Sequence, residues 1–210
     1  MPDYNSEADA VYPAIVEPLL AWYAAAARTL PWRENRDPYR VWVSEIMLQQ
    51  TRVEAVRAYY LRFMETFPDV QALAEAPEDT LLKAWEGLGY YARARNLQKT
   101  ARIIAARYGG VFPRSRDALM QLPGIGPYTA GAIASICFDL PEPAVDGNVL
   151  RVAARLTECF QPMEPLKNQI AKKLRAVYPS GRCGDFTQSL MELGAMVCLP
   201  GAPRCEQCPL

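Results

Sequence analysis

The chain has 210 residues, half of them hydrophobic, and its acidic and basic residues balance to a formal net charge of zero. This length can bury a hydrophobic core and allows one large or two small domains, and the ordinary charged fraction excludes a disordered chain. There is no histidine, which excludes catalytic triads and zinc sites that need an imidazole. Acid–base chemistry must therefore come from carboxylates, Tyr, Lys or Cys.

The chain shows no apolar run of membrane-spanning length and no signal peptide. We therefore expect a cytoplasmic protein of bacterial type, with no membrane partner and with reduced cysteines. The neutral total charge masks a basic sector at residues 82–110, where Glu86 is the only acidic residue. The bases of this sector are Lys83, Arg93, Arg95, Lys99, Arg102 and Arg107. Such a local excess of positive charge suits a phosphate-rich partner.

Apolar residues recur at helical spacing through nearly the whole chain, and no run alternates as a half-buried strand would. The sequence therefore predicts an all-α fold. Asp37 and Pro38 are expected to cap and open one helix. The predicted helices are 16–28, 39–50, 53–67, 70–76, 77–85, one from the turn 87–89 to Tyr108, 115–121, 128–137, 149–160, 166–178 and 186–197.

The chain is organised around a glycine-rich hairpin, residues 122–126 (LPGIG), which Pro127 and a helix follow. A turn without side chains lets a phosphate approach the backbone and meet the positive end of the helix dipole. The hairpin therefore predicts a DNA-backbone anchor. A packing corner between two helices is the alternative. A dinucleotide-binding fingerprint is less favoured, because no strand precedes the glycines and the third glycine is absent.

Two carboxylates are candidates for catalysis. Glu45 lies in the predicted helix 39–50, with apolar Val41, Trp42 and Leu48 at helical spacing. Burial there would raise the pKa of the carboxyl and keep it protonated, which suits a proton donor. Asp146 stands where another helical run begins. The residues alone leave alternatives for both. Glu45 could instead face solvent or pair with an Arg, and the sole role of Asp146 could be to cap a helix.

Two tyrosines, Tyr90 and Tyr91, follow the glycine turn 87–89 beside arginines. Their rings could stack on DNA bases or wedge between them. Tyrosines in such a helical stripe are more often core residues, and this alternative is the more common case before any family is considered.

The end of the chain brings together Cys198, Cys205 and Cys208, and the last two have metal-loop spacing. Three thiolates do not complete the four-cysteine set of an iron–sulfur cluster or a structural zinc. The alternative is a terminal loop of unliganded thiols. The other cysteines are predicted to be ordinary buried thiols: Cys137, Cys159 and Cys183.

Together, the hairpin, Asp146 and the cysteine-rich end resemble the helix-hairpin-helix base-excision DNA glycosylases, and most closely the MutY-type adenine DNA glycosylases. The similar stretches are 30–33, 41–51, 87–97, 122–135, 145–152 and 191–209. The run from Ser44 to Thr51 (SEIMLQQT) is the most specific of them.

The resemblance implies a six-helix barrel over residues 30–140, with the helix-hairpin-helix at 122–137. It also implies an iron–sulfur cluster domain, formed by residues 1–29 and 141–210, with the DNA cleft between the two domains. The family's fourth cluster cysteine and its C-terminal Nudix-like domain have no counterpart in the 210 residues. We therefore expect a truncated catalytic domain, whose [4Fe–4S] cluster needs a ligand from outside this chain.

The activity implied is a monofunctional glycosylase of base excision repair. It would act as a monomer on double-stranded chromosomal DNA, flip out an adenine paired with 8-oxoguanine or guanine, and hydrolyse its N-glycosidic bond. The alternatives are an endonuclease III-like glycosylase with lyase activity, a non-catalytic DNA-binding helix-hairpin-helix module, and a small iron–sulfur or zinc protein.

The resemblance also assigns residues. Glu45 matches the general acid, and Asp146 matches the carboxylate that stabilises the oxocarbenium-like sugar. Asn148 matches a residue that hydrogen-bonds near the sugar, and Tyr128 stands where lyases of the superfamily carry their Schiff-base lysine. Further matches are Leu30, Trp32, Arg33 and Glu192 in the adenine pocket, Gln50, Thr51, Leu88 and Tyr90 in a wedge beside the lesion, Leu122, Gly124, Ile125, Gly126 and Thr129 at the DNA backbone, and Cys198, Cys205 and Cys208 at the cluster. A monovalent cation is expected at the hairpin carbonyls.

Overall fold

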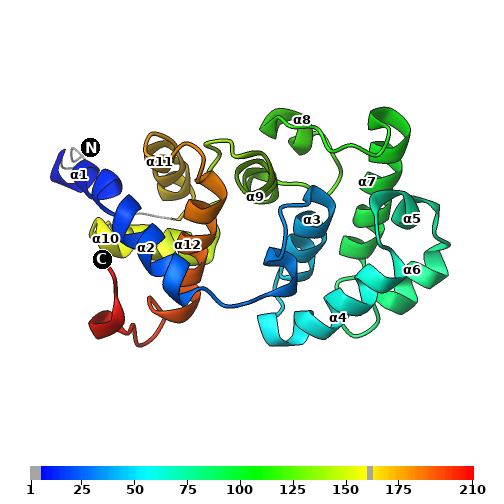
Figure 1. Cartoon of the computed structure of the whole chain (residues 1–210), viewed down its shortest axis with the longest axis horizontal. Helices are drawn as coiled ribbons and strands as arrows, with labels where there is room; N and C mark the ends of the chain where they lie inside the picture. Colours follow the sequence, from blue (N-terminus) through cyan, green and yellow to red (C-terminus); the bar gives the residue numbers. More distant parts are fainter. Residues whose placement is uncertain (1–5, 160–162) are drawn as a thin grey trace. The chain divides into compact units, whose positions relative to one another are not determined.

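A computed structural model describes residues 6–159 and 163–210. Every regular element of these residues is a helix, as Figure 1 shows, so the prediction of an all-α fold is confirmed for them. Contacts divide the chain into two compact units, Thr29–Ile133 and Met1–Arg28 with Ala134–Leu210. We call them the middle unit and the terminal unit. The resemblance placed the corresponding boundaries near residues 30 and 140, and the observed division falls inside a helix, α9 (Pro127–Phe138).

The middle unit is built around aromatic side chains. Trp42 packs edge-on against Phe112, with ring centroids 5.4 Å apart, and Phe63 packs edge-on against Trp85 at 5.9 Å. Asp37 caps the helix that carries Trp42, since its side chain accepts a hydrogen bond of 2.9 Å from the Arg40 amide. The helices are η1 (Pro31–Arg33), α3 (Pro38–Met47), α4 (Val53–Thr66), α5 (Val70–Glu75), α6 (Glu78–Ala84), α7 (Ala92–Tyr108), α8 (Arg116–Met120) and the first part of α9.

The terminal unit joins both ends of the chain around a second core that includes Leu19, Ile170 and Phe186. Its helices are α1 (Ser6–Ala14), α2 (Val16–Ala26), the rest of α9, α10 (Gly147–Leu156), α11 (Met163–Arg175), α12 (Cys183–Met196) and η2 (Cys205–Gln207). Helix α12 packs against both α2 and α10, so segments from the two ends of the sequence lie side by side (Figure 1). None of the described helices combines the length and the apolar character that a membrane crossing requires.

Several predicted helices extend too far, among them the helix predicted for 166–178, which ends at Arg175, and the helix predicted for 16–28, which ends at Ala26. The helix predicted for 39–50 ends at Met47, because Gln50 adopts a left-handed conformation (φ 58°) in the turn that follows. The helix predicted for 149–160 ends at Leu156, before Glu158, which also has a positive φ of 50°. Phe160, where that prediction ended, lies outside the described residues. Helix α1, which has Pro13 in its last turn, was not predicted.

Candidate active site

Glu45 lies in the last turn of α3 and is buried, with 7% of its surface exposed. The hydroxyl of Tyr128, in the first turn of α9, donates a hydrogen bond of 2.5 Å to Oε2 of Glu45. Both residues belong to the middle unit. The alternative of a solvent-facing Glu45 is therefore wrong. The Tyr128 hydroxyl thus contacts a buried carboxyl group directly, which is an arrangement able to hold and transfer a proton.

The hairpin lies against α7 and is bound to it through a backbone carbonyl. The hydroxyl of Thr100 donates to the Pro123 carbonyl at 2.7 Å, and the Ile125 amide donates to the Leu122 carbonyl at 3.1 Å. Gly124 has a positive φ of 76°, and a Cβ there would lie 2.9 Å from Cβ of Asn96. This position therefore requires glycine both for its conformation and for space.

The five residues predicted to contact the DNA backbone divide into two groups. Leu122, Ile125 and Thr129 are buried, so their side chains pack inside the middle unit. Gly124 and Gly126 are exposed, and nothing lies within 4 Å of a Cβ built on Gly126. An external ligand can therefore meet bare backbone at the two glycines, while the other three residues support the turn.

The four predicted wedge residues lie in two loops of the middle unit, one after α3 and one before α7. Gln50 and Tyr90 are exposed, and both have positive φ values, 58° and 48°. Thr51 is half-buried and Leu88 is buried. Tyr90 is 66% exposed and Tyr91 39%, so the alternative that these tyrosines are core residues is wrong.

Asp146 caps α10 and carries a second hydrogen bond on its side chain. The amide of Val149 donates to its Oδ1 at 2.8 Å, and Nδ2 of Asn148 donates to its Oδ2 at 2.8 Å. The helix cap, which the sequence offers as the alternative role of Asp146, is therefore present, and it is compatible with a catalytic role. Each of the two carboxylate oxygens thus accepts a hydrogen bond, and the positive end of the α10 dipole lies beside them.

Asn148 is itself oriented by Arg151, one turn along α10. Nη2 of Arg151 donates to Oδ1 of Asn148 at 2.9 Å and to the Gly194 carbonyl at 2.8 Å, and its Nε donates to the Cys198 carbonyl at 2.8 Å. Because a guanidinium only donates, the amide oxygen of Asn148 must face Arg151 and its NH₂ must face Asp146. Arg151 was not predicted as a site residue, although its spacing of three residues from Asn148 places the two on one helix face.

Of the residues predicted to bind adenine, three belong to the middle unit and one to the terminal unit. Leu30 and Trp32 are buried in the middle unit, where Trp32 packs edge-on against Tyr60, and Arg33 is half-buried. Glu192 belongs to α12 of the terminal unit and is 1% exposed. The sequence predicted no partner for this buried carboxylate.

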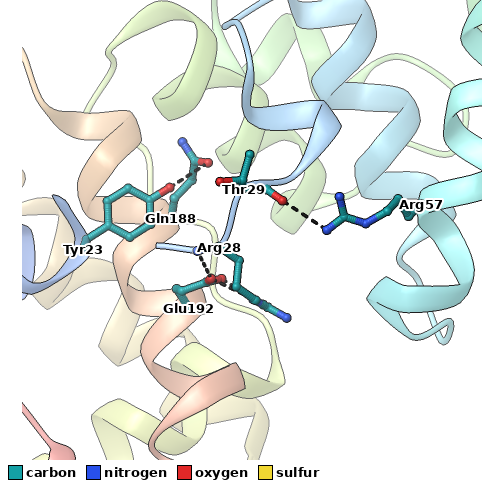
Figure 2. A network of polar contacts seen from close by, with 6 residues as sticks. All are labelled: Tyr23, Arg28, Thr29, Arg57, Gln188 and Glu192. Carbon is teal, nitrogen blue, oxygen red and sulfur yellow. Dashed lines mark hydrogen bonds and ion pairs between the residues drawn. The ribbon is translucent and has the colours of Figure 1, made fainter. Parts of the chain in front are cut away.

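Figure 2 shows that Arg28 is the partner of Glu192. Nε of Arg28 donates to Oε1 at 2.8 Å, Nη2 donates to Oε2 at 2.9 Å, and the Arg28 amide donates to Oε1 at 3.0 Å. The adjacent residue is held within the middle unit, where Arg57 donates to the Thr29 carbonyl at 3.1 Å. Arg28 and Thr29, between which the chain leaves one unit and enters the other, are therefore each hydrogen-bonded within their own unit.

The three cysteines at the end of the chain differ in their exposure. Cys205 is exposed, whereas Cys198 and Cys208 pack partly buried against the core of the terminal unit. Among the described residues, no group of three His, Cys, Asp or Glu side chains is close enough to hold a metal ion. The thiolates have the right chemistry for an iron–sulfur cluster, and three cysteines are one short of the usual set of four. No step of the chemistry proposed below uses such a group.

The other cysteines match the prediction of ordinary thiols in part. Cys159 and Cys183 are buried, and Cys137 is half-buried. The thiol of Cys183 donates to the Pro179 carbonyl at 3.4 Å. Burial, and then the nearby Asp139 carboxylate, raises the pKa of Cys183 to about 11.

Comparison with known proteins places these features in one family. Residues 43–179 match the model of the HhH-GPD superfamily of base excision DNA repair proteins. The chain is 42% identical to the adenine DNA glycosylase of Buchnera aphidicola subsp. Baizongia pistaciae and 45% identical to that of Mus musculus, in each case over 91% of the chain. It spans 55% and 39% of the length of these two curated relatives.

Among solved structures, a thermostable thymine-DNA glycosylase superposes with a TM-score of 0.85 at 30% identity, over 95% of this chain and 93% of that protein. The match to the family model and the agreement of the helical fold are independent of the site geometry described above. The chain belongs to the HhH-GPD superfamily of base excision DNA repair proteins.

Proposed function

We propose that this chain is the catalytic part of a monofunctional DNA glycosylase that removes adenine. The observation that carries the proposal is the contact of 2.5 Å between the hydroxyl of Tyr128 and the buried carboxyl of Glu45. A phenol cannot form the imine that a lyase needs, and a buried carboxyl is suited to giving a proton to a leaving base. The identity of 42% and 45% to two adenine DNA glycosylases supports the choice of base.

The proposed reaction uses the two carboxylates in different roles. Glu45 gives its proton to a ring nitrogen of adenine, and the bond between C1′ of the sugar and N9 breaks with its electron pair going to the base. Asp146, held by the Val149 amide and by Asn148, stabilises the positive charge that develops on the sugar. Water then adds to C1′ and gives up a proton to the Glu45 carboxylate, which restores the acid.

The proposed substrate is double-stranded chromosomal DNA in the cytoplasm with adenine opposite 8-oxoguanine or guanine, bound by a monomer. The adenine must leave the base stack before Glu45 can reach it. Gln50 and Tyr90, which are exposed on neighbouring loops, are suited to occupying the vacated space. The bare backbone of Gly124 and Gly126 is suited to accepting a phosphate near the start of α9.

We also propose that Cys198, Cys205 and Cys208 hold a [4Fe–4S] cluster when a fourth ligand from outside the 210 residues joins them. The support is the thiolate chemistry and the short spacing of the three residues. The test is the iron content of a purified protein that is extended through a fourth cysteine. Cys205→Ser should lose iron, and Cys159→Ala, which changes a buried cysteine, should retain it. Equal iron content in the two variants would reject the proposal.

The activity itself is tested by single-turnover release of adenine from a duplex with one 8-oxoguanine·adenine pair. Glu45→Gln should abolish release while the variant still binds the duplex. Glu54→Gln is the matched control, because Glu54 is an exposed acid on α4 of the same unit. Borohydride should trap no covalent adduct. A trapped adduct would favour the lyase alternative, and binding without release by the unaltered protein would favour the non-catalytic module.

A further inference from the structure

The guanidinium of Arg93 lies against the C-terminal end of α3. Its Nη1 donates to three carbonyl oxygens, those of Ile46 at 2.8 Å, Met47 at 3.2 Å and Gln49 at 2.5 Å. The last carbonyls of a helix have no partner within the helix, and a positive charge there is favoured by the helix dipole. Arg93 therefore caps the end of the helix that carries Glu45.

The same guanidinium also binds the loop that precedes α7. Its Nη2 donates to the carbonyl oxygens of Leu88 at 3.1 Å and Gly89 at 3.5 Å. The guanidinium carbon lies 5.5 Å from the ring centroids of both Trp85 and Tyr90. One side chain is thus shared between two loops that are about 40 residues apart in sequence.

Each of these loops carries one residue in a conformation that side chains rarely adopt. Gln50 (φ 58°) directly follows the bound carbonyl of Gln49, and Tyr90 (φ 48°) directly follows that of Gly89. Non-glycine residues persist in the left-handed region only where their surroundings hold them there. In both loops, Arg93 donates a hydrogen bond to the carbonyl that precedes this residue. Each carbonyl also accepts from a residue of its own loop or of the preceding turn, Gln49 from Thr51 Oγ1 at 3.3 Å and Gly89 from Trp85 Nε1 at 3.0 Å, so Arg93 is the contact that the two loops share.

We propose that Arg93 is a positioning residue, which ties the loop after α3 to the loop before α7 so that Gln50 and Tyr90 are presented to DNA as one unit. The part of this proposal that concerns DNA rests on the proposed function. The connection that Arg93 makes between the two loops, which we call the tie, does not. Lysine could not replace Arg93, because an ammonium group lacks the planar fork that reaches carbonyls on two sides.

The matched variants are Arg93→Lys and Arg95→Lys, in the full chain. Arg95 lies two residues further along α7, is exposed, and pairs with Glu78 instead of contacting either loop. Amide hydrogen exchange is measured by mass spectrometry without DNA, in peptides that contain Thr51 and Leu88. These amides donate to the carbonyls of Leu48 and Trp85 within the two loops.

Arg93→Lys should speed exchange in both peptides by about tenfold, as expected for the loss of charge-assisted hydrogen bonds, and Arg95→Lys should change neither. Unchanged exchange in either peptide would overturn the tie, as would an equal effect of the two variants. If Arg93→Lys does not fold, a measurement on the unaltered protein tests the same contacts. The Nη protons of Arg93 should exchange with water more slowly than those of Arg95 in ¹⁵N-arginine spectra, and equal rates would overturn the tie.

The DNA arm uses a duplex with an 8-oxoguanine·adenine pair and 2-aminopurine beside the adenine, since 2-aminopurine becomes fluorescent when its stack opens. Arg93→Lys should reduce the fluorescence rise on binding, and Arg95→Lys should retain it. A full rise in Arg93→Lys would overturn the positioning role. Failure of the unaltered protein to release adenine would reject the proposed function alone, because the exchange experiment measures the tie without DNA.

Discussion

Gly194 of α12 lies so close to Asn148 of α10 that a Cβ on the glycine would be 2.5 Å from Cβ of Asn148. The same glycine is also joined to α10 by a hydrogen bond, because its carbonyl accepts from Arg151. The absence of a side chain at position 194 therefore fixes the distance between two helices and the place of the residue that hydrogen-bonds Asp146.

Replacing Gly194 with alanine should force these helices apart. We expect Gly194→Ala to lower the free energy of unfolding by about 2 kcal/mol, which is typical of overpacking, and to slow base release by displacing Asn148. Urea unfolding measures the first effect, and single-turnover kinetics the second. Gly201→Ala is the control, since nothing lies within 4 Å of a Cβ at Gly201. Equal stability of the two variants would contradict the prediction.

Arg151 donates to Oδ1 of Asn148, whereas the oxygens of Asp146 accept from Val149 and Asn148. We expect Arg151→Lys to slow base release by roughly tenfold to a hundredfold, the effect of losing hydrogen bonds from a charged group, with little change in DNA affinity. Arg155→Lys is the matched control on α10, because Arg155 donates to the carbonyls of Leu199 and Pro200 and not to Asn148. An equal loss of rate in both variants would show that the effect is general to the helix.

Tyr128→Phe removes the hydroxyl that donates to Glu45 and leaves the ring in place. We expect it to lower the free energy of unfolding by about 1–2 kcal/mol, because a buried carboxyl loses a hydrogen bond, and to slow adenine release. Tyr91→Phe, at an exposed tyrosine of the same unit, should affect neither quantity. The result that counts against the proposed acid is a Tyr128→Phe protein with unchanged rate and stability.

The sequence predicted most of the fold because helical periodicity, caps and glycine stops are local signals. The caps Asp37 and Asp146 and the helix end at Tyr108 all lie where the pattern placed them. It missed Arg28, Arg93 and Arg151, whose acceptors lie on other elements or on backbone carbonyls. Every residue has a backbone carbonyl, whatever its side chain. No sequence pattern could therefore have identified the carbonyls that Arg93 binds.

The cysteines should differ sharply in reactivity. Because the pKa of Cys183 is raised to about 11, this residue is almost entirely thiol at pH 8, and its thiolate appears only as the pH rises toward that value. Cys205 is exposed and should be alkylated first by iodoacetamide. Peptide mapping of the native protein measures the order, and the same reaction in urea should remove the difference. Equally fast labelling of Cys183 in the native protein would contradict it.

The ion pair of Arg28 with Glu192 gives the last prediction. The side chain of Glu192 is 1% exposed and that of Arg28 is 30% exposed. Arg28→Ala would therefore remove the guanidinium that donates to both oxygens of a buried carboxylate. We expect a loss of about 3 kcal/mol in the free energy of unfolding, because the desolvation of Glu192 is no longer offset. Adding Glu192→Gln to Arg28→Ala should recover part of the loss, since a neutral amide costs less to bury. If the double variant is as unstable as Arg28→Ala alone, packing of the Arg28 side chain, and not its charge, stabilises this end of α2.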